Sequence, residues 1–393
     1  MTAGHTACSD LHGVSESEAM KITGVEPVVL GFELTEPVRV SFGEMVHRYA
    51  ILVRIDTDAG ISGWGESWSN FPAWSPRERV YTIREGIAPH LLGEDPRQVG
   101  WLHDKLGRRL AGVARQWGAV GPISQAISGV DIALWDLLGK ETGLPLHKLW
   151  GGATDLEVPV YGSGLGPGAV RPLVTPLLRS GVTAFKLKVG FGEEADQRNL
   201  MEVREQIGPD GILLTDANQA WDLTTALRMA ALLAEFDTYW LEEPIPADQL
   251  AEMARLRAQV PFRIAGGENV YGCEGFRRLL DAGAVDIIQP DICKTGGLTE
   301  TRTICSMAAA RGVPYAPHYF GSAIGLIASL HLFAATPGGW MMELDANPNP
   351  LREELGGDAV APKNGCLPVP TGPGLGLVPD QRTIERYQLQ IGR

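Results

Sequence analysis

Two lysines stand two residues apart in an otherwise apolar stretch, FKLKVG, at residues 185–190. Alternate residues of a strand point to opposite faces, so Lys186 and Lys188 share one face and the apolar residues share the other. Ammonium groups on a buried face need acidic partners or a chemical role. The stretch therefore predicts a strand whose polar face lines a site, the alternative being a simple ion pair with a nearby acid.

Three acids end three later strand-like runs: Asp216 ends ILLTD, Glu242 ends TYWLE and Glu268 ends RIAGGE. Converging carboxylates repel one another unless a cation lies between them. Hard oxygen donors without Cys or His favour Mg²⁺, with Mn²⁺ as the alternative, and argue against zinc. We predict that the three acids form a metal site; the alternative is three separate charges. Glu243 points the other way and is expected to support its neighbour.

An acid and a histidine, Asp291 and His318, end the runs DIIQPDI and VPYAPH. An aspartate that accepts a hydrogen bond from one imidazole nitrogen raises the basicity of the other nitrogen. Lys188 and His318 are therefore two candidate bases on either side of the acids. A lysine close to a divalent ion and to a second lysine is expected to have a lowered pKa, which suits proton transfer.

Three further side chains are candidates to hold the substrate. A site of this kind removes the proton α to a carboxylate, and Lys186 would stabilise the enediolate that forms. Glu343, at the end of WMMELD, would donate a hydrogen bond to the second enolate oxygen if it is protonated, with Asp345 as a weaker competitor. Asn218 would either bind the substrate or cap its own loop.

The spacing of these residues indicates the elements that carry them. Successive site residues from Lys186 to Glu343 are 23 to 30 residues apart, which is roughly the length of one strand, one helix and two loops. Eight such units predict an α/β fold, a modified (β/α)₈ TIM barrel over residues 151–357. The strands of a barrel end at one common mouth, where these side chains would meet.

The chain before the barrel has a different pattern. Residues 21–150 combine antiparallel hairpins, such as YAILVRIDTDAGISGWGES, with the helical run ISQAISGVDIALWDLLGK, and this predicts an N-terminal α+β capping domain. Residues 1–20 are expected to be a mobile tail. The Pro- and Gly-rich segment 358–393 is expected to return to the capping domain as a strap.

Composition excludes several partners. The 393 residues carry a net charge of −13 without a basic stripe, which argues against nucleic acids and anionic membranes. No apolar run reaches the roughly 18 residues of a membrane span. The five cysteines show no CxxC pairing, and the N-terminus lacks a secretory signal, so a cytoplasmic protein with reduced thiols is expected.

Taken together, the motifs resemble the enolase superfamily and, within it, the mandelate racemase group. The resemblance covers about residues 21–380 and comprises SGVDIALWDLLGK, LHKLWGG, KLK, DAN, EEP, GGEN, QPDICKTGG and GPGLG, in the order of the family. It implies that the three acids hold Mg²⁺, that Lys188 is one base and that His318 with Asp291 is the other. It also implies a homo-oligomer and a small-molecule carboxylate substrate.

One position within this resemblance separates branches of the superfamily. Asp291 stands where muconate-cycloisomerase-like members carry a lysine, so the second base is expected to be histidine. KLKVGFGEEAD, GAVDIIQPD and MELDANPNPLR are most similar to galactarolactone cycloisomerase and sugar-acid dehydratases. The resemblance implies β-elimination from a sugar acid or lactone. The alternatives are a racemase or epimerase and a non-catalytic Mg²⁺/carboxylate binding protein.

The family places two loops of the capping domain over the barrel mouth, here expected at residues 33–48 and 66–76. The positions expected to set specificity at the mouth are Gln219, Trp221, Tyr319 and Phe320. Candidates to meet a distal carboxylate or hydroxyl of the substrate are Arg39, His47 and Arg48.

Overall fold

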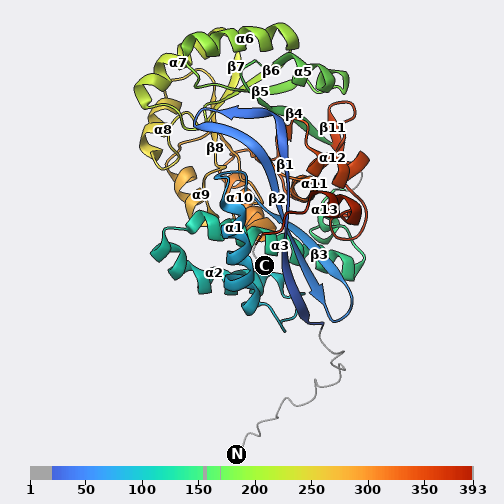
Figure 1. Ribbon diagram of the computed structural model, residues 1–393. Coiled ribbons are helices and arrows are strands. Elements are labelled where there is room, and N and C mark those ends of the chain that lie inside the picture. The colour runs from blue at the N-terminus through green and yellow to red at the C-terminus, as the bar shows by residue number, and fades with distance from the viewer. Residues whose placement is uncertain (1–19, 154–156, 169, 392–393) are drawn as a thin grey trace, which may run out of the picture.

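A computed structural model describes residues 20–153, 157–168 and 170–391 of the chain (Figure 1). The segment predicted to be a tail, residues 1–20, lies outside the described residues except for Met20. Within the described ranges no helix is long and apolar enough to cross a bilayer. The four cysteines that the structure describes are free thiols.

The first unit is built on an antiparallel sheet of β1 (Ile22–Val40), β2 (Gly43–Thr57) and β3 (Ser62–Ser67), in that order. Helix α3 (Val120–Thr142) packs closely on β3. A Cβ atom at Gly65 would lie 2.0 Å from the carbonyl oxygen of Gly129, so the contact requires glycine at this position of the GWG sequence.

Residues 33–48 were predicted to form a loop over the barrel mouth, but most of them are paired as strands. They form the end of the β1–β2 hairpin, with Val38 paired to Met45 and Val40 to Gly43 after a register shift that follows Glu33. Residues 34–37 have no paired partner in this register, and the ladder resumes at Val38. The hairpin extends toward the second unit (Figure 1).

Helices complete the first unit. They are α1 (Ser75–Tyr81), α2 (Val99–Trp117), α3 and α4 (Leu146–Leu149). Helix α2 buries Leu102, Leu106 and Leu110, a spacing of four residues that places all three on one face of a helix. The glycines Gly118 and Gly143 end α2 and α3 in the left-handed conformation that glycine adopts without strain.

The second unit is a parallel sheet in which strands alternate with helices. The strands run in the order β10 (Met342–Asp345), β4 (Glu157–Leu165), β5 (Ala184–Lys188), β6 (Ile212–Asp216), β7 (Thr238–Glu242), β8 (Arg263–Gly266) and β9 (Ile287–Ile288). The helices are α5 (Val170–Arg179), α6 (Glu193–Ile207), α7 (Leu223–Glu235), α8 (Leu250–Arg257), α9 (Gly272–Asp281), α10 (Gly297–Ala309) and α11 (Ala323–Ala335). Helices α5 to α9 lie on the outer side of the sheet (Figure 1).

The seventh unit of the predicted barrel contributes less than a strand. Tyr315 alone pairs in parallel with Ile288 on one side and with Gly339 on the other. Backbone hydrogen bonds from Ala316 to Ile288 and from Trp340 to Tyr315 accompany these bridges. Between β9 and β10, therefore, only Tyr315 makes strand-like pairs. The strand expected over VPYAPH does not form.

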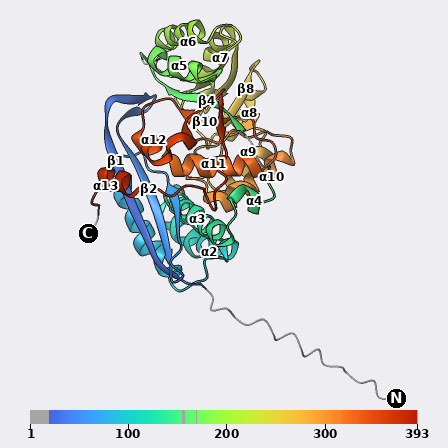
Figure 2. The ribbon, with the colours of Figure 1, turned by 90° about the vertical axis from the view of Figure 1, so that its right-hand side faces the viewer.

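The C-terminal segment contacts both units. It contains α12 (Pro350–Gly356), β11 (Cys366–Pro368), which pairs antiparallel with β4, and α13 (Gln381–Tyr387). The amide of Leu375 donates to Asp136 of α3, and the amide of Leu389 donates to the carbonyl of Val29 in β1. Figure 2 shows α13 lying beside β1.

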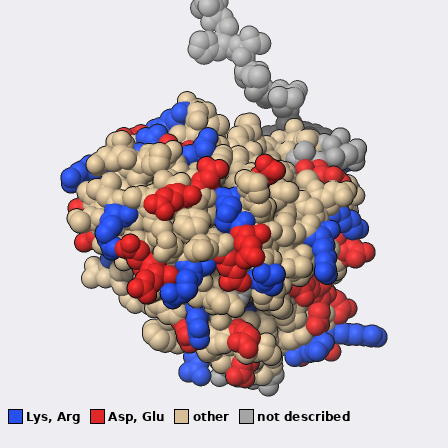
Figure 3. Space-filling model, turned by 90° about the horizontal axis from the view of Figure 1, so that it is seen from above, with Lys and Arg blue, Asp and Glu red and all other residues tan. Residues whose placement is uncertain are grey.

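Charged side chains of both signs are mixed on the outer surface. On the face shown in Figure 3, lysine and arginine are interspersed with aspartate and glutamate. The lysines and acids at the strand ends are buried and do not contribute to this surface.

Candidate active site

Both lysines of FKLKVG lie on the inner face of β5, as strand alternation predicts. Ala184, on the same face, belongs to the apolar cluster inside the barrel, whereas Phe185 and Leu187 belong to the larger core beneath the helices. Nζ of Lys186 is fully buried and lies 2.7 Å from Glu242 and 2.8 Å from Glu343. Burial disfavours the charge, but these acids outweigh it and hold the pKa of Lys186 well above its ordinary value.

Lys188 forms an ion pair with Asp216, its Cα partner on the neighbouring strand β6. Burial disfavours its charged form, yet the carboxylate of Asp216 outweighs burial and raises the pKa of Lys188 above the ordinary value. The lowered pKa predicted for Lys188 is therefore not what the protein's own charges produce. The reason is that the carboxylate lies in contact, closer than the second lysine.

The three acids predicted to bind a metal are brought together. Asp216 and Glu242 are paired residues at the ends of β6 and β7, and Glu268 follows β8. Carboxylate oxygens from the three lie within 4.8 Å of one another, and all three side chains are buried. Lys188, Lys186 and His318 contact Asp216, Glu242 and Glu268 respectively, so positive charge lies beside each buried acid.

The acid and the histidine predicted to form a pair do so. Nδ1 of His318 lies 2.7 Å from Oδ2 of Asp291, so Nδ1 carries the hydrogen and Nε2 faces Oε2 of Glu268 at 2.9 Å. The amide of Cys293 donates to the other oxygen of Asp291. Burial opposes protonation, but Glu268, Glu343 and the bond to Asp291 together raise the pKa of His318 to about 10.

Glu343, at β10, lies between two donors. Its carboxylate lies 2.8 Å from Nζ of Lys186 and accepts from the amide of Tyr319 at 3.0 Å. Burial favours the neutral acid, but Lys186 and His318 outweigh it, so the pKa of Glu343 is lowered. The predicted role as a hydrogen-bond donor needs the protonated form, and these contacts favour the ionised one. Asp345 is engaged elsewhere, in an ion pair with Arg48.

Asn218 lies beside Asp216, one of the three acids predicted to bind a metal. Its backbone amide donates to Oδ1 of Asp216 at 2.8 Å and its side-chain amide donates to Oδ2 at 3.3 Å. Its own Oδ1 is buried and has no hydrogen-bond partner among the described residues. The side chain thus supports Asp216 and also keeps one acceptor at the wall of the cavity.

Three supporting residues, Gln289, Asn269 and Lys294, were not assigned by the sequence. Gln289 donates to Glu242, and Lys294 donates to Asn269 at 3.0 Å, which in turn bonds both Glu243 and Glu268. Gln289 carried a signal, since it lies two residues before Asp291 on the same side of a strand end. Glu243 supports its neighbours as predicted, and burial followed by the charge of Glu268 raises its pKa to about 8.

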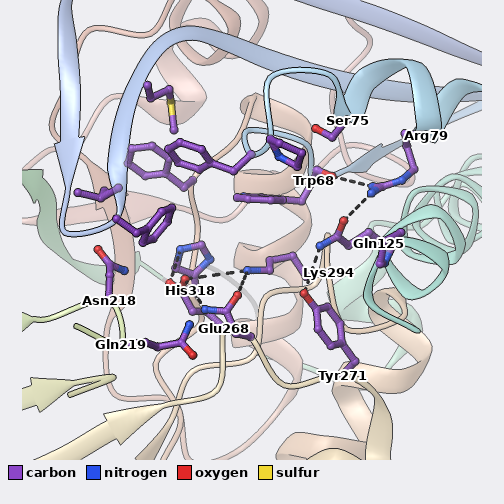
Figure 4. Close-up of a pocket in the computed structure, with 18 of the residues that line it drawn as sticks. Trp68, Ser75, Arg79, Gln125, Asn218, Gln219, Glu268, Tyr271, Lys294 and His318 are labelled. Atoms are coloured by element: carbon purple, nitrogen blue, oxygen red, sulfur yellow. Dashed lines mark hydrogen bonds and ion pairs between the residues drawn. The ribbon is translucent and has the colours of Figure 1, made fainter. Parts of the chain in front are cut away.

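A cavity of about 460 Å³ opens above these residues (Figure 4). Its floor includes Lys188, Asn218, Glu268, His318 and Glu343. The hairpin tip, the segment after β3, α1 and α3 supply the upper walls, so residues far apart in the sequence surround one space. The volume is that of an ordinary small-molecule site.

The expected specificity positions divide into two groups. Gln219 and Phe320 line the cavity, whereas Trp221 and Tyr319 are buried outside its lining. Tyr319 turns back because its hydroxyl donates to the carbonyl groups of Gly321 and Ser322.

None of the three residues proposed to meet a distal substrate group lines the cavity. Arg48 is buried, paired with Asp345, and lies with its Cζ 3.8 Å from the ring centre of Phe320. Arg39 pairs with Glu44, and His47 stacks on Tyr49.

Two family models match the chain. The description "Mandelate racemase / muconate lactonizing enzyme, N-terminal domain" matches residues 24–151, and "Enolase C-terminal domain-like" matches residues 170–383. The second match alone spans more than half of the chain. The chain belongs to the enolase superfamily.

Members of the superfamily with assigned activities resemble the chain over nearly its full length. It is 34% identical to D-galactarolactone cycloisomerase of Agrobacterium fabrum, over 94% of this chain and 99% of that one. It is 33% identical to arabinonate dehydratase of Saccharolobus solfataricus, over 86% and 90%. The structure of 3,6-anhydro-D-galactonate cycloisomerase from Zobellia galactanivorans is 35% identical, with a TM-score of 0.84 and coverage of 94% and 100%.

Proposed function

We propose that this enolase superfamily member is a Mg²⁺-dependent enzyme that removes the proton α to the carboxylate of a sugar acid or sugar lactone. Elimination of the β-oxygen would follow, as in an acid-sugar dehydratase or a lactone cycloisomerase. The observation that carries the proposal is the placement of two candidate bases: Lys188 contacts one acid of the triad, Asp216, and His318 contacts another, Glu268. The named relatives perform reactions of these two kinds.

The donor set fits Mg²⁺. Asp216, Glu242 and Glu268 offer hard carboxylate oxygens within 4.8 Å of one another, without sulfur or imidazole among the three. Bound there, Mg²⁺ would supply a Lewis acid that stabilises negative charge on a substrate carboxylate.

The chain's own residues then have distinct roles. Lys188 reaches the cavity from β5 and His318 from the segment after Tyr315. The group that is deprotonated can take the α proton, while the other, still protonated, gives a proton to the departing oxygen. Asp291 holds the tautomer of His318. Asn218 and Glu343 border the position of the substrate. The ammonium of Lys186 is buried outside the cavity lining, in contact with Glu242 and Glu343, and would add positive charge close to the developing negative charge.

The same pair of bases supports a second candidate function. If one base removes the α proton and the other returns a proton to the opposite face, the product is the epimer rather than an elimination product. Racemase or epimerase action on a 2-hydroxy acid is therefore the alternative. The presence of two bases does not by itself distinguish this reaction from β-elimination.

Hydrogen exchange in D₂O tests the proton-transfer step. With Mg²⁺ present, we expect a panel of aldonic, aldaric and lactone acids to include a substrate whose α hydrogen exchanges, followed by NMR. Lys188→Ala and His318→Ala should each slow turnover by about 100-fold or more, and Lys363→Ala, at an exposed lysine, should not. Exchange that neither variant alters would reject the two-base proposal. A keto acid product indicates elimination, and a product that differs only in optical rotation indicates epimerisation.

Metal binding gives a separate test. At 100 times its dissociation constant, Mg²⁺ should stabilise the folded protein by about 2.7 kcal/mol. Glu268→Gln removes one charge from the triad and should abolish both this stabilisation and turnover. Unchanged Mg²⁺ affinity in calorimetry of Glu268→Gln would refute the assignment of the metal site.

A further inference from the structure

We infer that the substrate is a ring-closed sugar acid, a carboxylate attached to a lactone or anhydro ring, and not an open-chain sugar acid. The inference rests on the proposed function and selects one of the leaving groups that this function leaves open. It is carried by the shape and chemistry of the cavity above the floor.

One wall of the cavity is apolar. It is supplied mainly by the lid tip, which we define as residues 40–46 at the turn of the β1–β2 hairpin, together with two phenylalanines from other segments. These side chains are Val40, Phe42, Met45, Phe71 and Phe320. The rings of Phe42 and Phe71 meet edge to face at 5.2 Å, which joins the lid tip to the segment after β3.

The rim of this wall leaves large apolar side chains in solvent. Phe42 is 62% exposed and Trp74 is 72% exposed, although both line the cavity. Exposed apolar side chains gathered at a cavity mouth mark a ligand site, since a ligand can remove them from water. The missing partner of this wall is therefore a ligand surface rich in C–H groups.

The other wall is polar. It comes from α1, α3 and the segments that follow β8 and β9, and its side chains are Ser75, Gln125, Asn269, Tyr271 and Lys294. Figure 4 shows Ser75, Gln125 and Tyr271 together on the side of the cavity away from the hairpin. Tyr271 accepts from Gln125 at 3.4 Å, which leaves its own hydrogen free to donate.

Lys294 also keeps hydrogen-bonding capacity on the polar wall. Its ammonium uses one N–H on Asn269 and lies 4.5 Å from the ring centre of Trp68. The nearest carboxylate oxygen, on Glu268, is 4.0 Å away. The polar wall therefore offers donors to oxygen atoms of a substrate.

Three substrate shapes can be compared against these walls. An open-chain sugar acid carries hydroxyl groups along both sides of its chain, so the apolar wall would bury some of them unpaired, which costs binding. An aryl acid fits the apolar wall but leaves the polar wall without acceptors. A sugar ring presents a C–H face to one wall and its hydroxyl edge to the other, and it alone satisfies both.

The ring determines the chemistry. The Cα–H bond breaks and its proton passes to Lys188 or His318; the C–H electron pair forms Cα=Cβ, and the Cβ–O bond to the ring oxygen breaks, with that oxygen keeping its pair. A lactone leaves as a carboxylate, so with ketonisation of the enol one proton is released per turnover. An anhydro ring leaves as an alkoxide that takes one proton, and no net proton is released. Both products are isomers of their substrates.

Matched substrate pairs test the inference on the Mg²⁺-loaded enzyme. Galactarolactone is compared with galactarate, 3,6-anhydrogalactonate with galactonate, and mandelate serves as the aryl acid. We expect kcat/KM for at least one ring-closed acid to exceed that of its open-chain partner by about 10-fold to 100-fold, the effect of one or two unpaired hydroxyls. Proton release in a pH-stat distinguishes the lactone from the anhydro ring.

Variants connect the preference to the apolar wall. Phe42→Ala should lower kcat/KM for the ring-closed acid by about 10-fold and leave that of the open-chain acid within about threefold. Val113→Ala, at an exposed side chain of α2 outside the cavity lining, should change neither. An equal effect of Phe42→Ala on both acids would overturn the inference.

The remaining outcomes separate the inference from the proposed function. Turnover that favours an open-chain acid or mandelate overturns the inference and leaves the α-proton chemistry standing. Absence of α-hydrogen exchange with every acid of the panel, in a protein that still binds Mg²⁺, overturns the proposed function and the inference with it.

Discussion

Residues 66–70 and the lid tip both bring the first unit of the chain onto the mouth of the barrel, but they make opposite kinds of contact. Glu66 is buried and accepts three hydrogen bonds, from the amide and hydroxyl of Ser322 and from the amide of Gly325. The lid tip leaves Phe42 and Val46 in solvent. The hydroxyl of Ser41 anchors the lid tip by donating to the carbonyl of Ala217 at 3.0 Å.

The buried contact reaches the backbone on both sides of the Asp291–His318 pair. The amide of Trp68 donates to the carbonyl of Cys293, two residues after Asp291. The side chain of Asn70 donates to the carbonyl of Phe320, two residues after His318. We call residues 66–70 the clamp. The difference teaches that one unit can hold the backbone beside the Asp291–His318 pair with one segment and supply an exposed cavity wall with another.

The largest effect that would break this comparison is expected at Glu66. Glu66→Gln places an N–H group against backbone donors, so the loop after His318 should shift. We expect α-hydrogen exchange at the face served by His318 to fall about 100-fold, and exchange at the Lys188 face to stay within about threefold. The measurement is NMR exchange of both α epimers of an active acid in D₂O.

Glu205→Gln, at an exposed acid of α6, is the matched control for Glu66→Gln. Ser322→Ala removes a single donor to Glu66 and should act in the same direction with a smaller effect. Equal loss at both faces would mean that the clamp only supports the fold, and no loss at either face would mean that it positions nothing.

Acid should weaken the packing of α11 against the rest of the protein. The clamp contacts the N-terminus of this helix through Glu66 and Ser322. Nε2 of His331 donates to the carbonyl of Leu375, so its Nδ1 accepts from Nδ1 of His147 at 3.0 Å. Burial, foremost, lowers the pKa of His331 from 6.5 to about 4. Between pH 6.5 and pH 4 the unfolded chain therefore binds more protons than the folded protein. The free energy of unfolding falls as the pH falls through this range, by at most about 3 kcal/mol.

Urea unfolding at pH 7 and pH 5 measures this loss. His331→Gln keeps a donor for Leu375 without a titrating group and should flatten the pH dependence. An unchanged difference between the two pH values in His331→Gln would assign the acid sensitivity to other groups.

The smallest effect is expected at the lid tip and its rim. Trp74 is 72% exposed, so Trp74→Ala should change the free energy of unfolding by no more than about 0.5 kcal/mol. Urea unfolding measures it, and a loss above about 1 kcal/mol would show that the rim is part of the core. If Trp74→Ala leaves the free energy of unfolding unchanged but alters the substrate preference, the rim serves the ligand and not the fold, in contrast to the clamp.

The floor of the site could be predicted because its signals are local. Strand alternation places Lys186 and Lys188 on one face, and regular strand–helix spacing brings the acids Asp216, Glu242 and Glu268 to one end of the sheet. The Asp291–His318 contact follows from the same rule. Where the rule weakens, so does the prediction: the seventh unit keeps its histidine at the mouth although Tyr315 alone forms its bridges.

The walls and the clamp carry no such local signal. Glu66 meets Ser322, and Gln125 of α3 meets Tyr271 after β8, across separations of 256 and 146 residues. No periodicity specifies such contacts, because they depend on how one unit packs on another. Arg48 shows the consequence, since a charge expected to face the substrate pairs with Asp345 once the hairpin is placed.

The alternation of residues and the repeat of strand and helix thus define the floor of the candidate site, because both are properties of consecutive residues. The shape of the space above it, the pairing of its charges and the segment that holds His318 depend on the docking of the first unit onto the barrel. Docking joins residues that are distant in the chain, and its geometry follows from packing and from the need to pair every buried polar group.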